Sequence, residues 1–100
     1  MEIIHHPEAH TFKTIVDGHP AYVTYAIHNG GLDIRHTVVP REIGGRGIAA
    51  RLVQSAYDYA LSQHLACIAT CSYAAIWLQR HPEYHGTTSK DYNGRNSCCL

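Results

Sequence analysis

A glycine-rich run lies where a strand-like segment passes into a helix-like one. It reads Gly44-Gly45-Arg46-Gly47-Ile48-Ala49 and follows Val38-Val39-Pro40. Because glycine has no Cβ, it adopts positive φ easily and lets a phosphate approach the backbone closely. Amides at the start of the next helix would lie at the positive end of the helix dipole. The run therefore predicts an anion site that suits a pyrophosphate.

Two common phosphate motifs do not describe this run. It lacks the Gly-Lys-Ser/Thr ending of a P-loop. Gly45 and Gly47 are followed by Ala50 instead of a third glycine, which makes the match to a dinucleotide-binding fingerprint marginal. A tight turn with a flexible helix entry is the alternative that needs no ligand. The elements on either side of the run must decide between the two.

Nine histidines make a metal site worth testing. His6 with His10, and His81 with His85, have the i, i+4 spacing that places two ligands on one helix face. A proline directly follows the first histidine of each pair, and the residue before proline is disfavoured in a helix. We therefore expect no metal at either pair.

The four cysteines are expected to be reduced thiols. Cys98 and Cys99 are adjacent and therefore awkward to bridge to each other, and the N-terminus carries no secretory signal. Cys67 and Cys71 share the spacing of metal ligands, but they fall in a predicted strand and in the turn after it. A structural metal is not expected here either.

Three antiparallel strands are predicted before the glycine run. Residues 11–16, 21–28 and 32–39 are rich in β-branched and aromatic side chains. Asp17-Gly18 separates the first two segments, and Asn29-Gly30-Gly31 supplies the positive φ angles of a tight hairpin between the second and third. The glycine run thus follows the end of a strand.

A strand–helix–strand unit is predicted next. Polar residues recur at helical spacing from Gly47 to about His64, which indicates an amphipathic helix. The apolar run Leu65–Ala69 suits a buried strand parallel to the one before the helix. Ser72 is expected to cap a short helix that ends before His81-Pro82. The predicted fold class is α/β with a mixed sheet.

Size and composition indicate one globular domain. The chain has 100 residues, of which 45% are hydrophobic and 16% charged. Residues 1–86 are expected to form the domain and residues 87–100 a polar, loosely ordered tail. Eight basic and eight acidic residues cancel, which argues against nucleic acid as a partner. We expect no membrane span, a cytoplasmic location, and a monomer or weak homodimer.

The order of these features resembles the GNAT superfamily of N-acetyltransferases, whose pyrophosphate loop reads Gln/Arg-x-x-Gly-x-Gly/Ala. Gly45 and Gly47 take the two small positions, and Glu42 departs from the family at the first one. The likeness is greatest to small, single-domain, YjdJ-like members and spans roughly residues 10–85. His36-Thr37-Val38-Val39-Pro40, Cys71-Ser72-Tyr73 and His81-Pro82-Glu83-Tyr84 match it in order.

The resemblance implies acetyl-CoA as the donor and an amine as the acceptor. It implies that the pyrophosphate rests on the amides of the glycine run and that the pantetheine lies beside the preceding strand. Arg46 is expected either to contact a phosphate or to be solvated. The cofactor-binding residues implied in this way are Val38, Val39, Gly44, Gly45, Arg46, Gly47, Ile48, Ala49 and Ser72.

Three residues are candidates for the chemistry that the resemblance implies. His36 could accept the proton of the acceptor ammonium. Cys71 could take the acetyl group first or merely line the thioester pocket, and direct transfer is the more common route in the superfamily. Tyr73 could protonate the leaving thiolate, although an anchoring role in the core is favoured. For His36 and Cys71, a satisfied and partly buried side chain is the alternative.

Three functions remain open from the sequence. The first is an N-acetyltransferase for a protein lysine or small amine, with an open acceptor side because few residues precede the first hairpin. The second is an acyl-CoA-binding or regulatory module without catalysis. The third is a metal-binding regulator. Glu42 brings a negative charge near the predicted pyrophosphate site, so Glu42→Gln is expected to tighten CoA binding.

Overall fold

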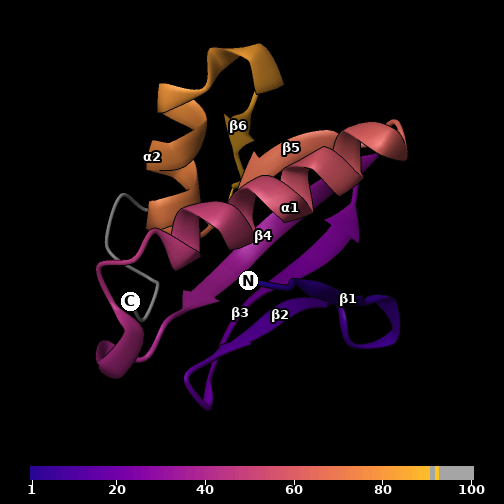
Figure 1. Ribbon diagram of the computed structural model, residues 1–100. Helices are drawn as coiled ribbons and strands as arrows, with labels where there is room; N and C mark the ends of the chain where they lie inside the picture. The colour runs from indigo at the N-terminus through magenta and orange to yellow at the C-terminus, as the bar shows by residue number, and fades with distance from the viewer. Residues whose placement is uncertain (91, 93–100) are drawn as a thin grey trace.

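A six-stranded mixed sheet forms the centre of the computed structural model, which describes residues 1–90 and 92 (Figure 1). The strands lie side by side in chain order. The first four are antiparallel, and the last two are each parallel to the strand before them. They are β1 (Ile4–His6), β2 (Thr11–Val16), β3 (His19–His28), β4 (Gly31–Val38), β5 (Ala66–Ala69) and β6 (Thr87–Thr88).

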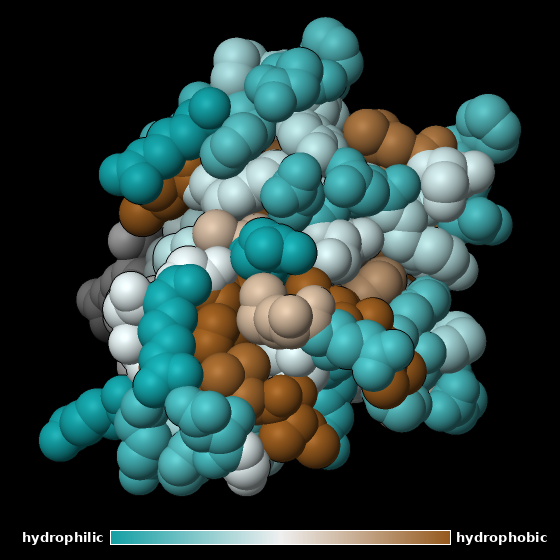
Figure 2. All heavy atoms as spheres, in the orientation of Figure 1, coloured by the Kyte–Doolittle hydropathy of each residue, from teal (hydrophilic) through white to brown (hydrophobic). Residues whose placement is uncertain are grey.

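Two α-helices cover one face of this sheet. α1 (Ile48–Ser62) connects β4 to β5, and α2 (Ser72–Arg80) connects β5 to β6. The rings of Tyr57 in α1 and Trp77 in α2 lie 5.8 Å apart, so the helices pack against each other on the same side. Figure 2 shows mainly hydrophilic side chains over α1, as its amphipathic pattern predicts.

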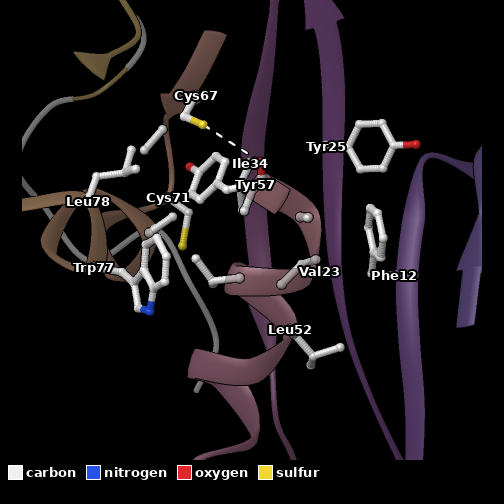
Figure 3. Close-up of a cluster of buried hydrophobic side chains, with 14 of the residues drawn as sticks. Phe12, Val23, Tyr25, Ile34, Leu52, Tyr57, Cys67, Cys71, Trp77 and Leu78 are labelled. Carbon is white, nitrogen blue, oxygen red and sulfur yellow. Dashed lines mark hydrogen bonds between the residues drawn. The ribbon is translucent and has the colours of Figure 1, made fainter. Parts of the chain in front are cut away.

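The core lies between the helices and the sheet (Figure 3). Side chains alternate along a strand, so β2 and β3 direct every second residue toward the helices. Phe12, Val23 and Tyr25 follow this alternation and are buried. From α1, Leu52 and Tyr57 are completely buried in the same core, and the Tyr57 hydroxyl donates to the Ile68 carbonyl at 2.6 Å. Burial of these apolar side chains holds the helices to the sheet.

The opposite side of the sheet, here called the open face, has no helix on it among residues 1–90 and 92. β2, β3 and β4 direct the residues of the other alternation toward it. Most of these side chains are half-buried or exposed, with Ile15 at 63% exposure, whereas Asp33 is completely buried. The open face is defined by Lys13, Ile15, Tyr22, Thr24, His28, Asp33 and His36.

The predicted order of strands and helices is confirmed, with differences at the ends of elements. β3 begins at His19 and β4 ends at Val38, one residue before the predicted end. α2 begins at Ser72, so the prediction of Ser72 as its cap is wrong: Cys71 precedes the helix and makes no side-chain cap bond. Three short 3-10 helices also occur: η1 (Pro7–Ala9), η2 (Arg41–Ile43) and η3 (Pro82–Tyr84).

Two strands were not predicted from the sequence. β1 pairs with β2, and β6 pairs with β5 within the segment that was expected to be a tail. The Ser89 amide also donates to the Ala69 carbonyl at 2.9 Å, so residues 87–89 are attached to the sheet. Residues 91 and 93–100 lie outside the described residues, and the expectation for them stays a prediction.

Candidate functional site

β4 and β5 separate at a defined point. Their last paired residues are Ile34 and Ala69, and the amides of Thr70 and Cys71 both donate to the Ile34 carbonyl at 3.0 Å. Beyond this point β4 continues to Val38 and, among residues 1–90 and 92, pairs only with β3. The backbones of β4 and of the β5–α2 connection therefore diverge beyond Ile34. Crevices at the carboxyl ends of parallel strands are common ligand sites.

The glycine run forms the connection from η2 to α1. Gly45 and Gly47 have φ angles of 77° and 75°, which L side chains rarely adopt. Gly47 directly precedes α1 and offers no side chain to cap it. Because the first amides of a helix have no partner within the helix, a ligand or solvent must accept from them. The positive φ angles and the helix start required by the predicted anion site are both present.

A cavity of about 430 Å³ lies at this helix start. Most of its lining was predicted from the sequence, and Tyr73, predicted as catalytic, also borders it. Arg41 borders it and was not predicted. Of the other residues expected to bind the cofactor, Val38, Arg46 and Ser72 are outside the lining. The lining consists of Val39, Arg41, Gly44, Gly45, Gly47, Ile48, Ala49 and Tyr73.

Arg46 is paired with the β2–β3 turn. Its guanidinium donates to the Asp17 carboxylate at 2.6 Å, and both side chains are largely exposed. An exposed ion pair of this kind contributes little to stability. Arg41 is therefore the arginine that faces the cavity, and Glu42, its neighbour in η2, is not part of the lining. The sequence offered no signal to choose Arg41 over Arg46.

Cys71 is completely buried beside the end of β4. Its sulfur lies 3.4 Å from the Thr37 hydroxyl oxygen. Cys71 is disulfide-bonded, whereas Cys67 is a free and buried thiol. The expectation of reduced cysteines is therefore wrong for Cys71, and a nucleophilic role for it stays a prediction for the reduced protein. Burial, with a smaller contribution from Asp58, raises the pKa of Cys67 to about 11.

Tyr73 is the second residue of α2 and lies at the edge of the cavity. Burial raises the pKa of its phenol, and the positive charge of Arg80 partly offsets the rise. The phenol is therefore protonated at neutral pH. This state suits both of its expected roles, as a proton donor and as an anchor.

His36 lies on the open face because of an irregularity in β4. Thr24 pairs with His36 and Tyr25 pairs with Ile34, which leaves Arg35 as an extra residue. Such a bulge locally redirects side chains. His36 is exposed and has no hydrogen-bond partner among the described residues. His36 and Cys71 lie on opposite sides of β4, so the structure does not bring them together.

A buried carboxylate on the open face was missed from the sequence. Asp33 of β4 is completely buried. It accepts from His28 at 3.0 Å, from Arg35 at 3.1 Å and from the Thr70 hydroxyl at 2.9 Å. The network thus joins β3, β4 and the start of the β5–α2 connection where β4 and β5 separate. Its signal in the sequence is an acidic residue between two apolar ones, Leu32 and Ile34.

No three His, Cys, Asp or Glu side chains in residues 1–90 and 92 are grouped so that they could hold a metal ion. Within the same residues, neither helix is long and apolar enough to cross a bilayer.

Known proteins resemble the chain in part of their length. Protein NATD1 of Xenopus tropicalis is 35% identical over 51 residues, which are 51% of this chain and 47% of that protein. Protein NATD1 of Mus musculus and of Homo sapiens match with the same identity over 46% and 45% of their lengths. The chain thus spans about half the length of these curated relatives.

A solved structure and a family model cover most of the chain. The NMR structure of a GCN5-like protein from Staphylococcus aureus is 28% identical and covers 88% of this chain and 87% of that one, with a TM-score of 0.68. The YjdJ-like subgroup is not distinguished by these matches and stays a prediction. Residues 11–87 match the model of the GCN5-related N-acetyl-transferases. The chain belongs to the GCN5-related N-acetyl-transferase family.

Proposed function

We propose that this chain is an acetyl-CoA-dependent N-acetyltransferase that passes the acetyl group directly to an amine. The observation that carries the proposal is the cavity at the start of α1, which opens beside the end of β4. Helix starts of this kind favour anionic ligands. The acceptor is proposed to approach from the open face, because the helices occupy the other side.

The residues around the cavity fit a CoA-like ligand. Gly45 and Gly47 have open space where a Cβ would be, so the backbone is accessible to a phosphate. Arg41 adds a positive charge, while Val39 and Ile48 supply apolar surface for a pantetheine chain. Within the described part of the chain, no acidic residue belongs to the lining. These features together support CoA more than a neutral ligand.

Side chains near β4 would accept and donate the protons that the transfer requires. When bound, acetyl-CoA supplies an activated acetyl group, and its transfer forms a C–N bond and breaks a C–S bond. The thiolate gains one proton, and the ammonium nitrogen loses two, the second as the amide forms and the first before the nitrogen attacks. His36 is the residue on the acceptor side that could take the first of these two protons. Tyr73, protonated at neutral pH, could supply the proton that the thiolate needs.

Direct transfer is preferred over an acetyl-enzyme. Only a thiolate is an effective nucleophile, and Cys71 is fully buried and disulfide-bonded. A route through Cys71 would need the reduced protein and a change in its surroundings. Bisubstrate kinetics would test this preference. Double-reciprocal plots of the initial rate are expected to intersect, and parallel plots would favour the acetyl-enzyme.

Thermal melting with and without CoA tests whether the folded protein binds CoA. A ligand at a hundredfold excess over its dissociation constant stabilises the folded state by about 2.7 kcal/mol. Gly47→Ala is expected to weaken CoA binding, because both the φ angle and the phosphate approach are disturbed. Gly30→Ala is the matched control, since Gly30 also has a positive φ and open space but lies in the β3–β4 turn. Equal CoA shifts in both variants would contradict the assigned site.

Release of free CoA from acetyl-CoA in the presence of an amine panel tests the activity. His36→Gln is expected to lower the rate by about a hundredfold, within the usual range for loss of a general base, and to leave CoA melting shifts unchanged. Full activity in this variant would remove His36 from the mechanism. It would leave the transferase proposal intact.

The alternative function is a CoA-binding module without catalysis. The absence of a hydrogen-bond partner for His36 among the described residues favours it, because catalytic histidines are usually oriented by a neighbour. A CoA melting shift together with no CoA release across peptides and small amines would support this alternative. Sustained release with any acceptor would exclude it.

A further inference from the structure

A second groove adjoins the cavity at the start of α1. It has a volume of about 260 Å³ and runs between α1 and α2. Tyr73 borders both spaces, so they meet at this ring. The groove is bordered by Ala50, Gln54, Tyr73, Ile76, Trp77, Arg80 and His81.

Arg80 gives this groove its charge. It is the last residue of α2, its side chain is exposed, and it forms no ion pair or side-chain hydrogen bond with another described residue. Among residues 1–90 and 92, no acidic residue borders the groove, so no described lining residue neutralises the guanidinium. A guanidinium is well suited to phosphate because its donors match the geometry of the oxygens.

The remaining lining suits a nucleoside. Ile76 and Ala50 are apolar, and the Trp77 ring stacks on His81 at 3.9 Å, which fixes the position of the imidazole. The Trp77 carbonyl can only accept, so Nδ1 of His81 donates to it at 2.8 Å, and Nε2 is left for another partner. Apolar surface with a few polar groups is typical of small-molecule sites.

The two spaces together have two separated positive charges. Arg41 borders only the cavity at the glycine run, and Arg80 borders only the groove. A ligand that spans both would need two separated anionic groups with an apolar or aromatic part near Tyr73. CoA has this pattern: its pyrophosphate is separated from a 3′-phosphate by the adenosine ribose.

We propose that Arg80 binds the 3′-phosphate of CoA and makes the chain select CoA over 3′-dephospho-CoA. This inference rests on the proposed function, because it requires the pyrophosphate to occupy the cavity beside Gly47. Arg80 also has a simpler role, since a positive charge near the C-terminal end of a helix interacts favourably with the helix dipole and stabilises the helix. That role would affect folding in the same way with and without a ligand.

Calorimetric binding of CoA and of 3′-dephospho-CoA tests the inference without any assay of activity. Wild-type protein is expected to bind CoA about tenfold more tightly, the usual effect of one charge-assisted hydrogen bond near solvent. Arg80→Gln is expected to lower the ratio to about one by weakening only CoA. Arg80→Lys is expected to keep part of the ratio, because a lysine retains the charge without the fork geometry.

Arg51→Gln is the control, because Arg51 is an exposed arginine of α1 that borders neither space. It is expected to leave the ratio at its wild-type value. Equal affinities of wild-type protein for the two ligands, or an unchanged ratio in Arg80→Gln, would overturn the inference while leaving the proposed function in place. Failure of both ligands to bind would overturn the proposed function as well.

Discussion

The two faces of the sheet are built from the same strands but differ in what covers them. On the helix side, β2, β3 and β4 contribute apolar side chains that α1 and α2 exclude from water. On the open face, alternate residues of the same strands are polar or half-exposed, and Asp33 is the buried exception. One sheet therefore supplies both the core and an uncovered surface beside the candidate site.

This difference separates two tasks. The helix side carries the stability of the domain and forms the walls of the cavity and the groove. The open face contributes little apolar burial, so its residues can differ without loss of the core. The network around Asp33 is an exception, because it lies on the open face and joins three segments where β4 and β5 separate.

Truncation of one apolar residue on each side tests the contrast most strongly. Leu52→Ala removes a completely buried side chain of α1 and is expected to lower the free energy of unfolding by about 3 kcal/mol. Ile15→Ala removes a side chain that is 63% exposed on the open face and is expected to cost less than about 0.5 kcal/mol. Urea denaturation with unchanged m-values measures both. Similar losses would mean that the open face is covered in solution.

Thiol reactivity provides a second comparison of the faces. A pKa of about 11 for Cys67, against 9.0 for a free thiol, lowers its thiolate fraction near pH 8 about a hundredfold. Slow alkylation of Cys67 is therefore expected in the folded protein, and normal alkylation in urea. A cysteine introduced by Thr24→Cys on the open face is expected to react fast. Peptide mapping of the alkylated protein measures each site, and rapid labelling of folded Cys67 would contradict its burial.

The same pKa shift predicts a loss of stability at alkaline pH. The folded state keeps the Cys67 proton to higher pH than the unfolded state, so this contribution is fully present below pH 9 and is lost as the pH rises toward 11. Cys67→Ala is expected to flatten this part of the stability profile. An unchanged slope between pH 9 and pH 11 would assign the loss to other groups.

Removal of the buried carboxylate tests the exception on the open face. Asp33→Ala leaves Arg35 and Thr70 without their shared acceptor and is expected to cost about 2 kcal/mol, less than a fully buried pair because Arg35 is partly exposed. Thr24→Ala, on the same face, is the control and is expected to change stability by less than about 0.5 kcal/mol. Equal losses of stability for the two variants in chemical denaturation would mean that the hydrogen bonds to Asp33 contribute nothing measurable.

A smaller effect is expected where a glycine permits close packing on the open face. A Cβ at Gly31 would collide with the end of the Ile68 side chain, which has to move. Gly31→Ala is expected to cost about 1 kcal/mol, a typical value for mild overpacking. The additional change Ile68→Val shortens the opposing side chain and is expected to restore part of the loss. No recovery in the double variant would indicate backbone strain instead.

The longer elements could be predicted because their patterns are local. The helical spacing of polar residues after Gly47 and the turn residues between β3 and β4 are legible without tertiary information. β1 and β6 could not be found in this way, because three and two residues are too few to show an alternation. Their pairing depends on the neighbouring strand, which only the folded chain provides.

The candidate site shows the same limit. The glycine run could be recognised because the residues that permit its positive φ angles are close together in the sequence. The partner of Arg46 was not predicted, since Asp17 lies in a distant turn. Arg41 lies in η2 and borders the cavity, a position that depends on the folded chain. Likewise, the hydrogen-bond donors to the Asp33 carboxylate come from β3, β4 and the β5–α2 connection, so their proximity depends on strand register.

The parallel pairing of β4 with β5 has a consequence for the order of folding. The hairpins from β2 to β4 close over short turns, but Gly31 meets Ala66 only after the whole of α1 has been placed. Long-range closure is slower and entropically more costly. The cavity lies where these two parts join, so we expect it to be completed late and to open early. Hydrogen exchange at the Thr70 and Cys71 amides, which both bond to Ile34, would therefore report how long the site stays assembled.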